Sequence, residues 1–212
     1  MLGILKEIII MKKDIYKKIE KIFKDNNGYT RTQDILDANI HSSHLYKLEN
    51  EEEITKVKRG LYRWNDQKYD TEMEMVEVQK IVPDGVISLL SALSYYELTT
   101  YNPWEYYIAI HRDHFKPTLP DYPPISIYYF SEDQYYTGIT EIDIKGEKVK
   151  IYDREKTICD CIRYRKKIGV DVMKEALQEY LKQDYRDIDK LIKYAEITGV
   201  KTLMNRYLEV LV

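Results

Sequence analysis

The sequence predicts an α+β protein, with a small N-terminal region followed by a longer C-terminal one. Three observations predict it. Residues 28–64 combine two short helical patterns with two strand-like segments that meet at a glycine. Residues 106–152 contain β-branched, aromatic and alternating segments that are typical of strands. From residue 154 onward, apolar residues recur at helical spacing. A chain of 212 residues is long enough for two domains or one large one.

An apolar stripe indicates a first helix. Its members recur at i, i+4, i+7 and i+8: Ile15, Ile19, Ile22 and Phe23. The Asn-Asn-Gly sequence at 26–28 ends the helix, because Gly and Asn accept the left-handed conformation of a helix cap. Residues 1–11 are apolar but interrupted by Lys6 and Glu7, too short for a membrane span and unlike a signal peptide. Either Met11 is the true start and residues 1–10 are an upstream addition, or these residues extend the first helix and pair with another copy of the chain.

A second, shorter helix follows this cap. Thr30 or Thr32 can begin it, since Thr accepts a hydrogen bond from a free backbone N–H group of the first turn. The helix contains Ile35 and Leu36 and ends near residues 38–39.

A third helix begins at Ser42 or Ser43, which can cap it in the same way. Leu45 and Leu48 lie three residues apart and face inward. The other face of this helix presents Ser43, His44, Tyr46 and Lys47.

Two strand segments, Ile54–Lys58 and Leu61–Trp64, form a hairpin that turns at Arg59-Gly60. Apolar Ile54 and Val57 are three residues apart, so we expect a bulge or a short strand. Two short helices, a tight turn and a two-stranded wing predict a winged helix-turn-helix within a domain of residues 1–65.

This arrangement suits duplex DNA. The third helix would place its N-terminal residues at base edges in the major groove, and its N–H groups would favour phosphate. Lys58, Arg59 and Arg63 on the wing tip would contact phosphates or the minor groove. The acidic run 49–53 would repel phosphate, so we expect it to point away, in the loop before the wing. The alternative is that the same fold serves as a protein-interaction module.

Charge is unevenly distributed along the chain. Residues 1–65 hold 13 basic and 10 acidic side chains, residues 66–155 hold 8 and 17, and residues 156–212 hold 12 and 9. A basic N-terminal segment followed by an acidic central segment fits a DNA-binding domain joined to a domain with another role. It excludes a protein that coats nucleic acid along its whole length.

The longer region begins after a polar stretch at 65–71, where we place the domain boundary. A helix over 72–82 precedes an almost wholly apolar segment, 86–98, that predicts a buried helix. Strands at 106–111 and 125–130 and a hairpin over 139–152 then predict a small antiparallel or mixed sheet. Residues 72–152 are therefore helix plus sheet, and 153–212 form a bundle of four helices. Together they make a C-terminal domain of residues 66–212.

No residue set predicts catalysis, a metal or a cofactor. Cys159 and Cys161 are too close on a helix to form a disulfide, and we expect them in the core of a protein from a reducing cytosol. No glycine-rich phosphate loop occurs. His111 and His114 follow a strand and have no third ligand, which favours a loop with exposed histidines over a metal site.

A nuclease-like set also has a simpler interpretation. Asp84, Asp143 and Lys145 have the residue types of a metal-dependent nuclease site. We interpret Asp84 as part of a Pro-Asp-Gly turn, and the other two as solvent-facing hairpin residues.

The chain contains 21 tyrosines. Tyrosine is favoured both in sheets and at protein interfaces, so the sequence leaves core and partner surface equally open.

Several blocks together resemble the AbiEi-type antitoxins of abortive-infection toxin–antitoxin modules, over about residues 12–200. The blocks are 58–64 (KRGLYRW), 83–94 (PDGVISLLSALS), 107–110 (YIAI), 152–160 (YDREKTICD) and 164–169 (YRKKIG). The resemblance implies a phage-defence transcriptional autorepressor with an N-terminal winged helix. The remainder of the chain would neutralise a nucleotidyltransferase-like toxin from the neighbouring gene, in a type IV system that needs no stable toxin complex.

The candidate DNA-binding residues come from the helix face, the wing tip and the positions that match the family. They are Arg31, Thr32, Ser42, Ser43, His44, Tyr46, Lys47, Lys58, Arg59 and Arg63.

We therefore expect a cytoplasmic, non-enzymatic antitoxin that binds inverted repeats in its own promoter, without cofactor, metal or membrane. One winged helix reads few base pairs, so binding would use a homodimer or two cooperating monomers. Two alternatives stay open. The C-terminal domain could be an enzyme that modifies the toxin or its target, or the protein could sequester a partner through its tyrosines.

Overall fold

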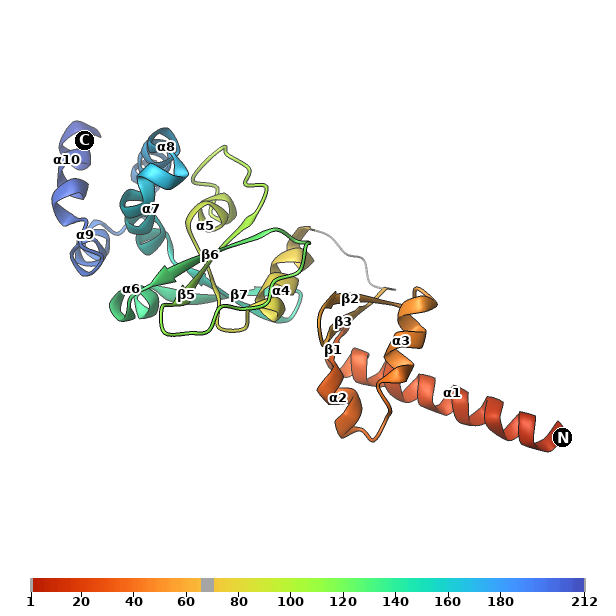
Figure 1. Ribbon diagram of the computed structural model, residues 1–212. Helices are drawn as coiled ribbons and strands as arrows, with labels where there is room; N and C mark the ends of the chain where they lie inside the picture. The colour runs from red at the N-terminus through yellow and green to blue at the C-terminus, as the bar shows by residue number, and fades with distance from the viewer. Residues whose placement is uncertain (1, 66–70, 212) are drawn as a thin grey trace. The chain divides into compact units, whose positions relative to one another are not determined.

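The computed structural model describes residues 2–65 and 71–211 (Figure 1). The chain divides into two compact units: residues 1–70 with 118–120, and residues 71–117 with 121–212. The expected domain boundary falls largely on residues 66–70, which lie outside the described residues. The described residues form ten helices and two sheets, so the protein is α+β as the sequence predicts.

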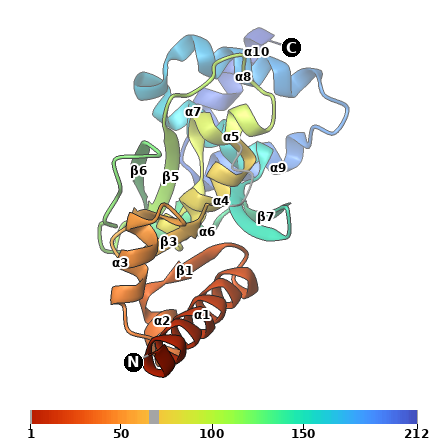
Figure 2. The same cartoon turned by 90° about the vertical axis from the view of Figure 1, so that its right-hand side faces the viewer.

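The first unit combines helices with a three-stranded antiparallel sheet (Figures 1 and 2). In chain order its described elements are α1 (Leu2–Asp25), β1 (Tyr29–Arg31), α2 (Thr32–Asp37), α3 (Ser43–Asn50), β2 (Ile54–Lys58) and β3 (Leu61–Trp64). Strand β3 is central, with β1 on one side and β2 on the other. The helices and hairpin occupy the predicted segments, and residues 2–11 continue α1.

The sheet contains one strand that the sequence did not predict. Strand β1 has only three residues, and its pairing with β3 matches Tyr29 with Arg63 and Arg31 with Leu61. Three residues are too few to show the alternation of apolar and polar side chains that predicts a strand. The segment is recognisable as a strand only through its pairing with β3. The expected bulge is confirmed, because the β2–β3 register shifts between Lys56 and Lys58.

Each helix of the first unit ends in a Schellman motif, in which a residue with left-handed backbone lets the next N–H group reach back into the helix. The bonds are Gly28 N–H to Phe23 O at 2.7 Å, Ile40 N–H to Ile35 O at 3.0 Å and Glu53 N–H to Leu48 O at 3.0 Å. The left-handed residues are Asn27, Asn39 and Glu52. The predicted stop after α1 is therefore confirmed, with a residue type that tolerates this conformation.

The start of α2 differs from the prediction. Neither Thr30 nor Thr32 caps it, because Thr30 lies in β1 and Thr32 is already the first helical residue. The N-cap is Arg31, whose backbone N–H donates to the Asp34 carboxylate at 2.6 Å. The sheet sets this start, since β1 runs directly into the helix.

The second unit has a five-stranded sheet and most of the helices. Its described elements are α4 (Thr71–Ile81), β4 (Val86–Ile87), α5 (Leu89–Tyr95), β5 (Tyr106–His111), β6 (Ile125–Phe130), α6 (Glu132–Tyr136), β7 (Ile139–Ile144), β8 (Glu147–Tyr152), α7 (Arg154–Ile168), α8 (Val170–Lys182), α9 (Ile188–Ile197) and α10 (Lys201–Leu211). The strand order is β6-β5-β4-β8-β7. Neighbours pair both parallel and antiparallel, so the sheet is mixed.

The apolar segment 86–98 is not one buried helix, as the sequence suggested. Its first two residues form β4 in the centre of the sheet, and the helix begins only at Leu89. A wholly apolar run has no periodicity that separates a buried strand from a buried helix. The two therefore look alike in the sequence.

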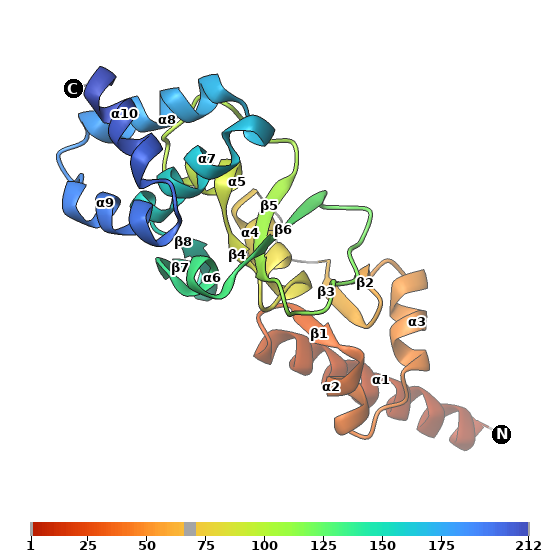
Figure 3. The same ribbon diagram turned by 60° about the vertical axis from the view of Figure 1, so that its left-hand side comes forward.

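The four predicted C-terminal helices are present as α7–α10, grouped beside the sheet in Figure 3. They share a hydrophobic core with α5, in which both Cys159 and Cys161 are fully buried as free thiols. Asp187 caps α9 as expected, by accepting from the Lys190 N–H at 2.9 Å. None of the described helices combines the length and apolar character that crossing a bilayer requires.

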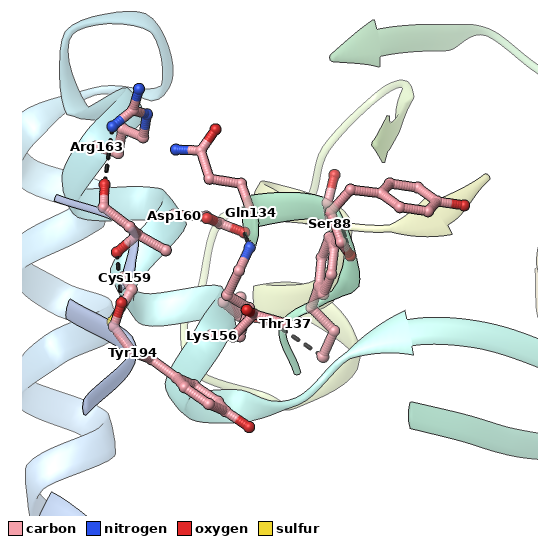
Figure 4. A network of polar contacts seen from close by, with 12 residues as sticks. Ser88, Gln134, Thr137, Lys156, Cys159, Asp160, Arg163 and Tyr194 are labelled. Atoms are coloured by element: carbon pink, nitrogen blue, oxygen red, sulfur yellow. Dashed lines mark hydrogen bonds and ion pairs between the residues drawn. The ribbon is translucent and has the colours of Figure 1, made fainter. Parts of the chain in front are cut away.

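A buried ion pair lies on α7 (Figure 4). Lys156 and Asp160 are both 0 % exposed, and their Nζ and Oδ2 atoms are 2.6 Å apart. The Lys156 ammonium also lies 4.0 Å from the centre of the Tyr152 ring. Burial raises the pKa of Asp160 to about 6, although Lys156 opposes the shift. Removing either side chain would leave the other as a buried charge without its partner, which destabilises the fold.

We expect Lys156→Met to reduce the free energy of unfolding by about 3–5 kcal/mol at pH 7, because it removes the cation that is hydrogen-bonded to a fully buried carboxylate. The loss should shrink as the pH falls toward 4. A carboxyl group whose folded pKa is raised binds more protons in the folded state, so lower pH favours folding. Urea denaturation at several pH values measures this. Adding Asp160→Leu should recover most of the loss, and a double variant as unstable as the single one would contradict the account.

Candidate nucleic-acid interface

The orientation of α3 is set by two buried leucines. Leu45 is 1 % exposed and Leu48 is 4 % exposed, and both pack in a cluster with residues of α1, α2 and the sheet. The opposite side of the helix faces outward: Ser43, Tyr46 and Lys47 are exposed, and Ser42 and His44 are half-buried. Tyr46 is 65 % exposed, a large fraction for an aromatic side chain. The helix thus presents the five predicted residues on or beside one polar surface.

The N-terminus of α3 carries a contact that the sequence did not reveal. Ser42 is the N-cap residue, but its side chain makes no capping bond. Instead, the His41 ring nitrogen Nδ1 accepts from the Ser43 N–H at 3.2 Å and lies 2.8 Å from the Ser43 hydroxyl. His41 therefore replaces the serine cap. The His41 ring also occupies the Ser43 N–H group, one of those that we expected to face phosphate. The sequence did not predict this contact because histidine is an uncommon capping residue.

The hairpin turn is fixed to the start of α2. The Thr32 N–H donates to the Gly60 carbonyl at 3.0 Å. Gly60 has φ +79°, and a Cβ atom there would lie 3.8 Å from the Thr32 hydroxyl. Glycine is thus required by the backbone conformation, and the turn and the helix start form one rigid corner.

Positive charge concentrates at this corner. Arg31 and Lys58 are both paired with Leu61, one from each side of β3. Partial burial, and then the Arg31 guanidinium, lower the pKa of the Lys58 ammonium below its ordinary value. Two cations this close favour an anion between or above them. Exposed Arg59 adds a third basic side chain at the turn.

Arg63 is not on the wing tip, as the sequence suggested. It lies within the central strand, paired with Tyr29 on one side and Thr55 on the other, and is half-buried. Exposed Lys56, on β2, was missed because the bulge hides the alternation that would have placed it outward.

The acidic run 49–53 only partly avoids the candidate surface. Glu53 is half-buried and accepts a hydrogen bond from the Tyr16 hydroxyl at 3.3 Å, so it points into the unit. Glu51, however, reaches back along the helix and pairs with Lys47 at 3.5 Å. The expectation that the whole run points away is therefore wrong for Glu51. Because both partners are exposed, the pair is worth less than about 1 kcal/mol and phosphate could displace it.

The candidate residues form two groups. Ser42, Ser43, His44, Tyr46 and Lys47 belong to α3, which packs on β2. Arg31, Thr32, Lys58 and Arg59 belong to the basic corner, where the turn meets α2. Both groups belong to the same compact unit.

The alternative sites in the second unit have structural roles. Asp143 accepts from the Gly146 N–H at 3.0 Å and so shapes the β7–β8 turn. His111 is not exposed, contrary to expectation: it is 6 % exposed in β5, with Nε2 2.9 Å from a Glu132 carboxylate oxygen. Within the described part of the chain, no three His, Cys, Asp or Glu side chains gather as they would around a metal ion.

The family-model match lies within the first unit. Residues 17–64 match the family model described as "Transcriptional regulator, AbiEi antitoxin", a span that runs from α1 to the end of β3. This is the family whose likeness the sequence blocks indicated, and the match locates an antitoxin and transcriptional-regulator signature in the unit with α3 and the basic corner. The comparison with curated proteins found no match.

Among solved structures, the chain is similar to the RV2827C protein from Mycobacterium tuberculosis. The TM-score is 0.48 at 10% sequence identity, over 91% of this chain and 78% of that one.

The capping role of His41 is testable by stability. His41→Ala removes the acceptor for the Ser43 N–H, so we expect the first unit to lose about 0.5–2 kcal/mol of unfolding free energy. His41→Asp restores a good cap and should be close to the wild type. Thermal unfolding followed by calorimetry compares the three proteins, and an alanine variant as stable as the wild type would show that the ring bond contributes nothing.

Proposed function

We propose that residues 1–65 form a winged helix-turn-helix domain that binds duplex DNA and represses the protein's own promoter. The element order of the first unit and its three-stranded sheet support this proposal. The family match over residues 17–64 supports the role of regulator. The single observation that carries it is the polar face of α3, held outward by Leu45 and Leu48.

In this proposal α3 is the recognition helix. Its exposed Ser43, Tyr46 and Lys47 approach base edges in the major groove. The basic corner of Arg31, Lys58 and Arg59 holds phosphates of the flanking backbone, which provides affinity with little sequence information. Because one such domain reads few base pairs, the operator would be an inverted repeat bound by a homodimer or by two cooperating monomers.

We further propose that the C-terminal domain expected from the sequence, residues 66–212, neutralises a nucleotidyltransferase-like toxin by a binding role rather than by catalysis. The match to an antitoxin family supports this assignment, as does the acidic character of residues 66–155, which suits a protein partner better than a nucleic acid. The place of action would be the cytoplasm, where both toxin and promoter lie.

Promoter binding is tested by gel shift with the upstream DNA at two salt concentrations. Lys47→Ala and Arg59→Ala should each weaken binding, and Arg59→Ala should also reduce the salt slope by about one unit, because it removes one phosphate contact. Glu51→Gln should tighten binding, since it frees Lys47 and removes a negative charge.

Lys193→Ala is the matched control, because it removes an exposed lysine from α9 of the second unit. If this control weakened binding as much as Lys47→Ala, the proposed interface would be wrong.

The two roles should be separable in cells. A chain carrying both Lys47→Ala and Arg59→Ala should lose repression of a promoter reporter while still protecting cells from the co-expressed toxin. Loss of protection at equal protein level would show that neutralisation works through DNA, and would overturn the division of roles.

A further inference from the structure

A pocket in the second unit combines acidic and aromatic side chains. It has a volume of about 300 Å³ and lies between α4, the end of α5 and the chain that leads into β5 and β6. This is at the lower limit of small-molecule sites, which run from ~300 to ~1,000 Å³. It has room for one side chain or a ligand of similar size.

A carboxylate in this pocket is held in a fixed orientation. Glu74 of α4 accepts from the Tyr106 hydroxyl at 2.9 Å on Oε2, and from the Tyr122 hydroxyl on Oε1. Burial and the bond to Glu74 raise the pKa of Tyr106, so this hydroxyl remains a donor. Among the residues that the structure describes, no lysine or arginine forms an ion pair with Glu74. Within the described part of the chain, this carboxylate is held in position by two hydroxyl groups and by no cation.

The Glu74 carboxylate has more acceptor positions than the two tyrosines use. A carboxylate has about four acceptor positions, two on each oxygen. The two tyrosines use one position on each oxygen of Glu74, so one further position remains on each. Two acceptors side by side match the parallel N–H groups of a guanidinium, which binds carboxylates in this bidentate way.

Aromatic rings complete the pocket. Trp104 is 71 % exposed and Tyr95 is 41 % exposed, and both line it. Exposed tryptophan is enriched at protein interfaces, and the faces of Trp and Tyr attract cations. A second carboxylate, Glu105, also lines the pocket. The surroundings therefore favour a planar cation over an anion or a neutral ligand.

We propose that this pocket binds an arginine side chain that a protein partner presents, with its guanidinium bidentate on Glu74 and its plane against Trp104. A partner is favoured over a free amino acid, because the exposed aromatic rim offers further area that only a larger surface would cover. This proposal is independent of DNA binding, and it assigns the second unit a chemically defined contact.

The chain has two tryptophans, Trp104 in the pocket and Trp64 in the core of the first unit, and this allows an internally controlled test. The full-length protein is titrated with acetyl-Gly-Arg-Gly-amide while the two indole N–H signals are followed by NMR. We expect a saturable shift of the Trp104 signal, with the Trp64 signal unchanged. The same peptide with citrulline, a neutral isostere, should bind about tenfold more weakly or not at all.

Variants then test the carboxylate. Glu74→Gln should weaken the arginine peptide by about tenfold, while Glu141→Gln, on β7, should leave it unchanged as the matched loss of a negative charge. The comparison of the arginine and citrulline peptides uses the wild-type protein, so it tests arginine binding even if Glu74→Gln fails to fold.

Three results would overturn the proposal. They are equal binding of the arginine and citrulline peptides, an unmoved Trp104 signal, and tighter binding of free L-arginine than of the arginine peptide.

Discussion

The candidate interface depends on the burial of Leu45 and Leu48. These two side chains occupy the core of the first unit, and their removal from water fixes the rotation of α3 about its own axis. A rotation of half a turn would expose both leucines and bury Lys47, at a cost of several kcal/mol. The polar face is therefore defined by the core beneath it, before any DNA is present.

Local backbone geometry supports this arrangement. Left-handed residues end α1, α2 and α3 abruptly and let the chain change direction after each helix. The bond between Thr32 and Gly60 then ties the hairpin turn to α2. Because the turn cannot swing freely, the positive charges of Arg31 and Lys58 stay concentrated at one corner. A fixed charge cluster binds phosphate with less loss of entropy than a flexible arm.

The sequence predicted the elements of the first unit well, because its apolar residues follow helical and hairpin spacing closely. It missed β1, which exists only through its pairing with β3, and the His41 cap, which no spacing announces. Prediction was weaker for the second unit. The apolar segment 86–98 hides a strand followed by a helix, and His111 looked exposed because it comes directly before charged residues.

The candidate residues follow the same division. Those on α3 were found by helical periodicity, while Arg63 was misplaced because sequence alone does not distinguish a strand centre from a wing tip. We expected Glu51 to point away from the candidate surface with its neighbours, although its i,i+4 spacing from Lys47, which predicts an ion pair on the helix, was visible in the sequence. The pocket around Glu74 could not be predicted, since it brings Glu74 together with Tyr122, which lies 48 positions further along the chain.

The most direct measurement is a map of amide NMR shifts as an upstream duplex is added to the full-length protein. The account predicts that the largest shifts fall on residues 42–47 and 58–60, that α7–α10 are unaffected, and that a scrambled duplex produces smaller shifts at the same molar ratio. Shifts that are largest in the second unit, with α3 unchanged, would contradict it.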